Sequence, residues 1–369
     1  MVTSPSVTSG DDVAGDGDVA IAMLLGMSQV PPARGRPGPS IADVARLAGV
    51  SQQTVSRVST GATNVRPETR ERVLAAMDQL GYSPNHAARA LRSGSFGTIG
   101  LIAHRLTRTG ESRTFEGVVE AARQHGYSVT LVDVRTPSSS DLSDAVRRLG
   151  HQAIDGLVVI RAEDATPATL ALPPRLPVVV SDSRFVGHHP AVGTDQAEGA
   201  SLAVQHLLDL GHPTVHHVGG PLDSTPARVR ADAWRTRLRA AGRAVPDEWH
   251  GDWSAASGYE VGARIAASPE VTAVFCANDE MAAGVVRALH EAGRRVPEDV
   301  SVVGFDDIPM AEYLWPPLTT VRQDFQAIGA ELVELLMRQM REHVSLAGHH
   351  VVVPTRLVER ASTAPPRTR

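Results

Sequence analysis

Residues 273–304 read AVFCANDEMAAGVVRALHEAGRRVPEDVSVVG and contain the structural unit that repeats through most of this 369-residue chain. Two short apolar runs, at residues 273–277 and 300–304, are typical of strands that a parallel sheet buries on both faces. Between them, residues 280–292 have helical spacing, and Gly293 stands where a helix would end. This stretch therefore predicts a strand, a helix and a second, parallel strand.

The same alternation begins at about residue 98 and continues on both sides of this unit. Similar apolar runs predict strands at residues 99–103, 128–132, 156–160, 177–180 and 214–218, and residues 197–210 have a helical pattern. Gly126, Gly211 and Gly242 stand at further helix ends. Alternating strands and helices predict an α/β architecture of doubly wound parallel sheets, and the length of this region is enough for two lobes.

The composition is that of an ordinary globular protein, with 42% hydrophobic and 21% charged residues. The one cysteine, Cys276, excludes an intramolecular disulfide and a multi-cysteine metal site, and its apolar surroundings predict a core position. No apolar run approaches the ~18 residues of a membrane span. The apolar run at residues 19–27 follows acidic residues rather than the basic segment of a secretory signal, so we expect a cytoplasmic protein.

Both ends of the chain differ from this pattern. Residues 1–39 are rich in Gly, Ser, Pro and Asp and are expected to form a disordered extension, within which Met23 and Met27 are alternative starts. Residues 362–369 are expected to form a loose tail. Residues 40–93 hold seven arginines and four acidic residues, which makes this segment basic within a chain of net charge −5.

Residues 40–58, SIADVARLAGVSQQTVSRV, predict two short helices joined by a tight turn. Ser40 and Asp43 have the spacing of a capping box, and Gly49 allows the left-handed backbone of the turn. Ser51 would cap the second helix. The inward residues are expected to be Ile41, Val44, Ala45, Ala48, Val55 and Val58, and the outward ones Gln52, Gln53, Ser56 and Arg57.

This geometry is that of a helix-turn-helix, whose second helix enters the major groove of DNA. Glutamine pairs with adenine edges and arginine with guanine, and each good contact contributes ~1–3 kcal/mol. Ser51 and Thr54 suit phosphate oxygens. The alternative is a solvated surface hairpin without a DNA role.

A third helix is expected from Pro67 to just before Gly81, with an apolar stripe of Val73, Leu74, Met77 and Leu80. In the following segment, YSPNHAARALRSG (82–94), Asn85 would cap a short helix that carries Ala88 and Leu91 on one side. A leucine flanked by Arg89 and Arg92 suits a wedge in the minor groove. An ordinary linker is the alternative.

These segments resemble the headpiece and hinge of the lactose repressor family of bacterial regulators. The stretches that carry the resemblance are IADVARLAGVSQQTVSRV (41–58), ETRERVLAAMDQLGYSPNHAARALRSG (68–94) and TIGL (98–101). It continues to about Ala361 through GGPLDSTPARVRADAW (219–234), GDWSAASGY (251–259), CANDEMAAGVVRAL (276–289), SVVGFDDIP (301–309) and PPLTTVRQDF (316–325). Two departures are Arg66, where the family caps the third helix with Ser or Thr, and Val58-Ser-Thr-Gly, which lacks the usual Leu-Asn.

The resemblance implies a sugar-responsive transcription factor whose core is a periplasmic-binding-protein-like pair of lobes. It implies a DNA-binding headpiece at residues 40–84, a hinge helix and linker at 85–97, and a core at 98–361. One lobe would comprise about residues 98–193 plus 325–352, and the other about 194–321 plus 353–361. By the same resemblance, Gln52, Gln53 and Arg57 read bases and Leu91 intercalates.

A sugar site needs carboxylates and amides for hydroxyls, an arginine fork, and an aromatic face for the ring. Such groups follow predicted strands here, at the strand ends where α/β sheets bind ligands. The resemblance matches eight of them to effector-contacting residues: Asp182, Ser224, Arg230, Trp253, Asn278, Asp306, Gln323 and Phe325. Taken singly, each could be a cap or a turn residue, and we expect Asp279 and Asp307 to be helix caps.

The first lobe fits the family less well. Where the family has small apolar contacts, this chain has Arg108, Gly110 and Glu111. We therefore do not expect this chain to share the family's sugar specificity.

Catalysis, cofactors and resident metals are not expected. The histidine pairs at 188–189, 216–217 and 349–350 are adjacent in sequence, and neighbours on a strand or loop point apart, which makes poor chelators. No Gly-x-Ser-x-Gly elbow or phosphate-binding loop occurs, and the adjacent acids Asp306 and Asp307 seldom share a substrate atom in such a turn.

We therefore expect a cytoplasmic, homodimeric repressor, not an enzyme, that binds double-stranded operator DNA and a small carbohydrate and has no membrane partner. A dimer is favoured because residues 361–369 lack the leucine heptad of the family's tetramers. One alternative is a sugar-binding protein for transport or sensing, which the basic headpiece argues against. The other is a sugar-processing enzyme, which would need a nucleophile or a metal set.

Overall fold

The computed structural model describes residues 39–59, 62, 64–83, 95–104, 106–134, 139–150, 154–160, 176–181 and 187–367. These residues belong to two compact units, residues 1–85 and residues 86–369. Residues 1–38 of the predicted extension and the predicted site residues Asn85, Ala88, Arg89, Leu91 and Asp182 lie outside the described residues. Nowhere in these ranges is a helix long and apolar enough to cross a membrane.

The first unit contains the three predicted helices, α1 (Ile41–Ala48), α2 (Gln52–Ser59) and α3 (Pro67–Leu80). Ser40 and Asp43 form the predicted capping box, and Gly49 takes the left-handed backbone at φ 63°. Their small shared core consists of Val44, Ala45, Ala48, Val55, Val58, Val73, Ala76 and Met77. The prediction for Leu74 was wrong: it is 51% exposed, because the buried face of α3 runs through Val73, Ala76 and Met77 at helical spacing.

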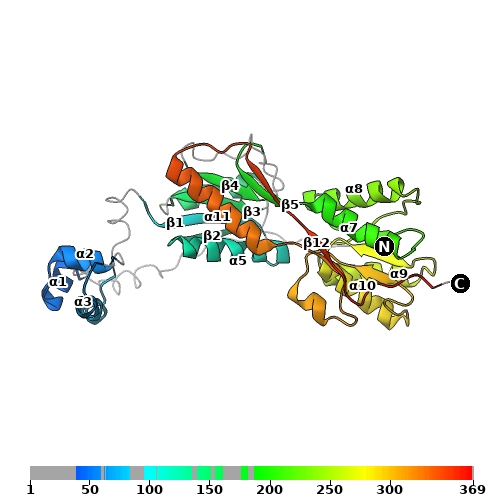
Figure 1. Cartoon of the computed structure of the whole chain (residues 1–369), viewed down its shortest axis with the longest axis horizontal. Coiled ribbons are helices and arrows are strands. Elements are labelled where there is room, and N and C mark those ends of the chain that lie inside the picture. The colour runs from blue at the N-terminus through cyan, green and yellow to red at the C-terminus, as the bar shows by residue number, and fades with distance from the viewer. Residues whose placement is uncertain are drawn as a thin grey trace, which may run out of the picture. The chain divides into compact units, whose positions relative to one another are not determined.

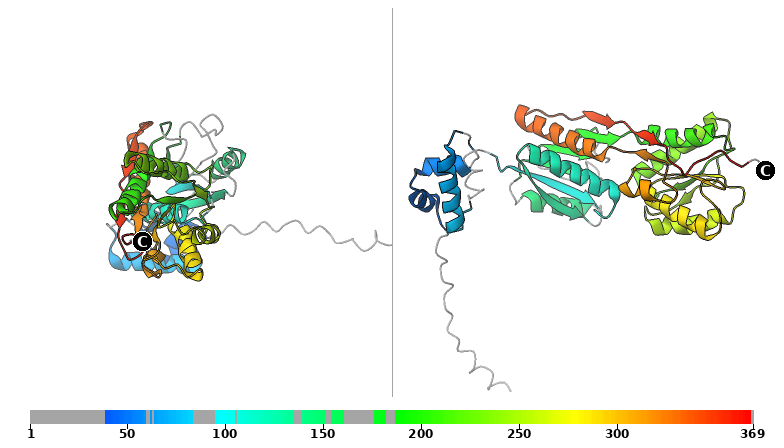
Figure 2. Two further views of the ribbon diagram at one scale, coloured as in Figure 1. Left: turned by 90° about the vertical axis from the view of Figure 1, so that its right-hand side faces the viewer. Right: turned by 60° about the horizontal axis from the view of Figure 1, so that its bottom comes forward.

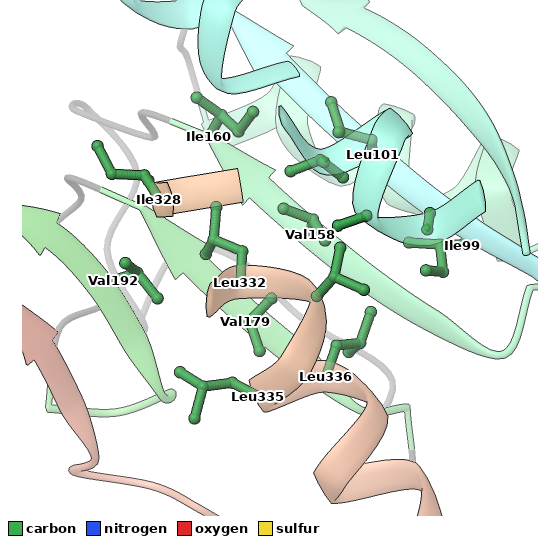
Figure 3. Close-up of a cluster of buried hydrophobic side chains, with 14 of the residues drawn as sticks. Ile99, Leu101, Val158, Ile160, Val179, Val192, Ile328, Leu332, Leu335 and Leu336 are labelled. Atoms are coloured by element: carbon green, nitrogen blue, oxygen red, sulfur yellow. The ribbon is translucent and has the colours of Figure 1, made fainter. Parts of the chain in front are cut away.

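The first lobe of the second unit is a six-stranded parallel sheet in the order β11-β5-β4-β3-β1-β2. Its strands are β1 (Thr98–His104), β2 (Ser128–Val134), β3 (Gly156–Ile160), β4 (Val178–Ser181), β5 (Ala191–Thr194) and β11 (His350–Val353). Helices α5 (Thr109–Gln124) and α11 (Phe325–Glu342) cover one face, and α6 (Ser139–Gly150) covers the other. Figure 3 shows Ile328, Leu332 and Leu336 of α11 packed among the valines and isoleucines of the strands.

The second lobe is a four-stranded parallel sheet in the order β7-β6-β8-β9. Its strands are β6 (His216–Gly219), β7 (Trp249–His250), β8 (Ala273–Cys276) and β9 (Ser301–Val303). Helices α7 (Gln196–Asp209) and α8 (Thr225–Ala240) pack on one face, and α9 (Ala255–Ala266) and α10 (Asp279–Glu291) pack on the other (Figures 1 and 2).

The chain passes between the lobes three times, from β5 to α7, from β10 (Thr320–Arg322) to α11, and from β11 to β12 (Arg356–Val358). Strands β10 and β12 pair antiparallel beside the second sheet, and the 3₁₀ helix η1 (Pro309–Tyr313) precedes β10 in the chain. The predicted α/β architecture with two lobes is confirmed, and all seven apolar runs chosen as strands form strands.

The prediction of a loose C-terminal tail was wrong as far as Arg367. Ser362 is fully buried; its hydroxyl donates to the carbonyl of Val302 at 2.6 Å and accepts from the Thr319 amide at 2.8 Å. Arg367 forms an ion pair of 2.8 Å with Asp299. The segment is held because the buried backbone groups of β9 need partners, and the amide of Val302 donates to the carbonyl of Ser362.

Candidate DNA-binding surface and ligand cavity

Helix α2 presents the predicted base-reading side chains to solvent. Val55 and Val58 are buried against α1 and α3, which fixes the rotation of the helix. As a result Gln52, Gln53 and Arg57 are exposed on the opposite side, and Ser56 is half-buried. This arrangement matches a recognition helix that offers its N-terminal residues to the major groove.

The hydroxyls predicted to contact phosphate also shape the start of α2. Ser51 Oγ accepts from the Thr54 amide at 3.2 Å and lies 2.9 Å from Thr54 Oγ1, so Ser51 caps the helix as expected. At the start of α3, Arg66 offers no side-chain cap, and Pro67 occupies the first helical position.

A cavity of about 330 Å³ lies between the two lobes of the second unit. Residues 107–111, at the start of α5, line it from the first lobe. From the second lobe it is lined by Arg230, Asp252, Trp253, Ser254, Asn278, Glu280 and Asp306. Four of the predicted ligand residues are therefore cavity residues, whereas Ser224, Gln323 and Phe325 are buried but do not line it.

At the cavity wall, four buried side chains form a closed ring of three hydrogen bonds and one ion pair. Arg230 Nε donates to Gln196 Oε1 at 2.7 Å, and Gln196 Nε2 donates to Gln323 Oε1 at 3.0 Å. Gln323 Nε2 donates to Asp306 Oδ1 at 2.5 Å, and this oxygen lies 3.6 Å from Arg230 Nη2. Gln323 thus orients Asp306 from behind. Gln196 was not predicted, although it is the first residue of α7, directly after the short strand β5 and its crossover.

Arg230 lines the cavity and also stabilises the fold around it. It is only 1% exposed, and its guanidinium lies 3.7 Å from the ring centre of Phe305 and 5.6 Å from that of Trp253. It also donates to the carbonyl of Ala277. Phe305 was not among the predicted ligand residues.

Asn278 holds the Trp253 loop in place while it caps α10. Its Oδ1 accepts from the Met281 amide at 3.0 Å, and its Nδ2 donates to the Trp253 carbonyl at 2.9 Å and to Glu280 at 2.8 Å. Trp253 and Asp306 have φ values of 77° and 114°, which non-glycine residues rarely adopt. Such backbone strain is typical of functional sites and persists only where the surroundings enforce it.

The cavity is rich in carboxylates, with Glu111, Asp252, Glu280 and Asp306 against the guanidinium groups of Arg108 and Arg230. Glu111 is fully buried, 3.7 Å from Arg108. Hydrogen bonds from Ser254 and Ser257 lower the pKa of Asp252, so this carboxylate is ionised at neutral pH. Across the cavity, the hydroxyl of Thr109 in the first lobe donates to Glu280 in the second.

The predictions that Asp279 and Asp307 are helix caps were wrong. Asn278, one residue earlier, caps α10, and the buried Asp279 accepts from the Ile308 amide at 2.8 Å and from Thr320. Burial, followed by the neighbouring Asp306 carboxylate, raises the pKa of Asp279 well above its usual value. Asp307 instead pairs with Arg322 and Arg360.

The part of the chain that the structure describes brings no three His, Cys, Asp or Glu side chains together as metal ligands. His217 is buried and contacts the carbonyl of Phe275 through Nδ1 at 2.8 Å, and burial lowers its pKa to about 3. Cys276 is buried in β8, where burial raises the pKa of its thiol. Its predicted core position is confirmed.

Comparisons with known proteins agree with both units. The family model "Bacterial regulatory proteins, lacI family" matches residues 40–85, and the "Periplasmic binding protein-like domain" matches residues 204–363. The lactose operon repressor of Escherichia coli strain K12 is 36% identical over 332 residues, covering 88% of this chain and 91% of the relative. The ribose operon repressor of the same strain is 33% identical over 306 residues, covering 81% and 92%.

Solved structures show the same likeness. The crystal structure of the Lac repressor dimer bound to operator and the anti-inducer ONPF matches with a TM-score of 0.76 and 33% identity. The match covers 89% of this chain and all of that one. With more than nine tenths of two repressors covered at this identity, the chain belongs to the lacI family of bacterial regulatory proteins.

Proposed function

We propose that this protein is a sequence-specific transcriptional repressor whose affinity for operator DNA is controlled by a small neutral carbohydrate. The observation that carries the proposal is the combination of the two units. One exposes Gln52, Gln53 and Arg57 on a helix-turn-helix, and the other encloses a polar cavity between two lobes. Its relatives are repressors rather than enzymes, and the proposal includes no catalytic step. We place the protein in the cytoplasm, with its DNA.

On DNA, α2 enters the major groove, where Gln52 and Gln53 reach adenine edges and Arg57 a guanine. Ser51, Thr54 and Ser56 meet the backbone. By family resemblance, Asn85, Ala88, Arg89 and Leu91 act in the minor groove beside it.

In the core, carboxylates accept hydrogen bonds from ligand hydroxyls, and the indole of Trp253 packs against the C–H face of a sugar ring. The excess of carboxylates over guanidinium groups disfavours a phosphorylated sugar, since the anion would lie among like charges. By resemblance, Asp182, Ser224 and Phe325 are also assigned to the ligand, although Ser224 and Phe325 do not line this cavity, and Gln323 acts through Asp306.

Ligand control follows if the sugar binds one arrangement of the lobes more tightly than another. The Thr109–Glu280 contact spans the cavity, so a ligand that inserts there changes the contacts between the lobes. To move an equilibrium from 1:99 to 99:1, the ligand must prefer one arrangement by about 5.5 kcal/mol.

We also propose a homodimer, since the operator of a helix-turn-helix dimer has two half-sites. The surface that we assign to the second copy is the aromatic patch, defined as Met310, Tyr313 and Trp315, which are 58%, 75% and 90% exposed. Exposed apolar clusters of this kind are typical of interfaces. The Lac repressor relative was crystallised as a dimer.

The test selects binding sites from random-sequence DNA and measures their affinity by fluorescence anisotropy. Replacing Gln52, Gln53 and Arg57 by Ala should abolish the sequence preference and cost ~1–3 kcal/mol for each lost base contact. The control is Arg72→Ala, which removes an exposed arginine from α3 and should leave the selected sequence unchanged. A triple variant that selects the wild-type sequence would contradict the proposal.

To test the ligand, neutral sugars are added to the protein–operator complex, and the change in affinity for operator DNA is measured. Trp253→Gly removes the indole without backbone strain, because glycine accepts a φ of 77°. This variant should bind operator as the wild type does and fail to respond to the sugar. An unchanged response would place the ligand outside this cavity.

A further inference from the structure

A second cavity, of about 340 Å³, lies at the crossovers between the lobes, and of the predicted ligand residues only Gln323 and Phe325 line it. It is lined by Arg113 of α5, by residues 307–309 and 312 around η1, by residues 322–326 between β10 and α11, and by Arg356 of β12 and Arg360 just beyond it. Four separate stretches of chain thus meet around one cavity. We call it the crossover cavity.

The charge of the crossover cavity is opposite to that of the sugar cavity. Its walls carry four arginines, Arg113, Arg322, Arg356 and Arg360, against three carboxylates, Asp307, Glu312 and Asp324. The sugar cavity has four carboxylates against two arginines. Two neighbouring cavities of similar volume therefore favour ligands of different charge.

The three carboxylates already have partners. Asp307, whose side chain is 4% exposed, accepts from Arg322 and lies 2.7 Å from Arg360 Nη2. Asp324 caps α11 by accepting from the Ala327 amide at 2.9 Å. Glu312 hydrogen-bonds the hydroxyl of Tyr313. In the part of the chain that the structure describes, Asp307 is thus the one carboxylate of this wall that pairs with arginines, and the four arginines still outnumber the three carboxylates.

Two of the four arginines have no carboxylate partner among the described residues. Neither Arg113 nor Arg356 forms an ion pair or a side-chain hydrogen bond with another described residue, although both line the cavity. Arg322 and Arg360 share the single carboxylate of Asp307. The guanidinium groups therefore retain donors that a ligand anion can accept, and arginine binds phosphate in a two-pronged geometry.

We propose that the crossover cavity binds a small molecule carrying a dianionic phosphate group, held chiefly by Arg113 and Arg356. Arg322 and Arg360 strengthen the local positive potential, and the side-chain amide of Gln326 suits a remaining oxygen. The volume exceeds the need of one phosphate ion, so a phosphate ester fits better than inorganic phosphate. This site is separate from the sugar cavity and does not depend on the proposed repressor function.

The experiment is isothermal titration calorimetry on the full chain, with sodium chloride keeping the ionic strength constant. The probes are glucose 6-phosphate, inorganic phosphate and glucose. We expect glucose 6-phosphate to bind in the crossover cavity more tightly than inorganic phosphate. Replacing both Arg113 and Arg356 by Gln should weaken the binding of both phosphate probes about tenfold or more, because each loses charge-assisted hydrogen bonds.

The matched control is Arg239→Gln with Arg243→Gln, which removes two exposed arginines near the end of α8, away from the crossover cavity. This variant should bind the phosphate probes as the wild type does, and thermal melts should show all three proteins folded. The proposal is overturned if neither phosphate probe binds at about 10 mM, or if both double variants bind equally well. Operator binding in phosphate-free buffer, measured on the same proteins, tests the repressor function separately.

Discussion

Arg230 shows how one side chain can serve both the cavity and the fold. Removing it by Arg230→Ala leaves Asp306 buried without its cation and the Ala277 carbonyl without a donor. Breaking a buried charge pair in this way costs about 3–5 kcal/mol, so we expect the free energy of unfolding in urea to fall by that amount. A second change, Asp306→Asn, should recover part of the loss because it removes the stranded charge. Unchanged stability in the single variant would contradict this view.

His217 makes the stability of the core depend on pH. It is fully buried beside the rings of Phe275 and Trp234, and burial lowers its pKa from 6.5 to about 3. A group with a lowered folded-state pKa contributes stability above its unfolded pKa of 6.5, and this is lost as pH falls from about 6.5 toward about 3.

Replacing this histidine by His217→Phe should therefore reduce the loss of unfolding free energy between about pH 7 and about pH 5.5 by about 1 kcal/mol. The readout is the difference between two urea titrations, which cancels any packing change that is the same at both pH values. His212, whose pKa is also lowered by burial, stays in both proteins and serves as the common background. An identical pH difference in the variant and the wild type would show that the pKa of His217 is the same in the folded and unfolded states.

At the same scale, the sequence predicted the cavity only in part. Asn278 and Asp306 could be placed because parallel strands end at one edge, and both follow predicted strands. The ring through Gln196 and Gln323 could not be predicted from the sequence, because it joins side chains 127 residues apart. Strand ends predict a site, but not which neighbouring side chains face the cavity and which lie behind it.

At the scale of elements, α9 and α10 depend on a glycine at their crossing. A Cβ atom on Gly284 would lie 2.1 Å from the carbonyl oxygen of Ala255 and 2.5 Å from the amide nitrogen of Tyr259. Alanine favours a helix by about 1 kcal/mol over glycine, but this clash is with backbone and overpacking costs about 1–3 kcal/mol. We expect Gly284→Ala to lower the melting temperature in spite of its better propensity.

The control on the same helix is Arg287→Ala, which changes an exposed side chain and should alter stability by no more than about 0.5 kcal/mol. If Gly284→Ala were more stable than the wild type, α9 and α10 would have to move apart at little cost to accommodate the Cβ atom.

Long elements were easier to predict than short ones. The buried strands are continuous apolar runs, so β1, β2, β3 and β8 could be recognised from the sequence. Strands β7, β10 and β12 have two or three residues, too few for a periodicity, and their pairing depends on the crossovers. The docked segment up to Arg367 was missed for a related reason, because a Pro- and Thr-rich sequence gives no sign of the buried backbone that it pairs with.

At the scale of the whole molecule, assembly decides how the two units act. One headpiece contacts one half-site, so two copies must be joined for tight binding of a palindromic operator. The aromatic patch is the strongest candidate for that junction among the described residues, because Trp315 is 90% exposed and Tyr313 is 75% exposed. Indole and phenol rings contribute much of the binding energy where they become buried between proteins.

Replacing both rings, Tyr313→Ser with Trp315→Ser, should convert the dimer to a monomer at about 1 μM, as measured by light scattering. Operator affinity should fall with it, because each half-site would then be bound separately, while the circular dichroism of the core stays unchanged. Leu222→Ser is the matched control: Leu222 is 71% exposed in the loop before α8, and its loss should leave the dimer intact. If the double variant remains a dimer, the copies meet through another face of the lobes, and the patch must bind something else.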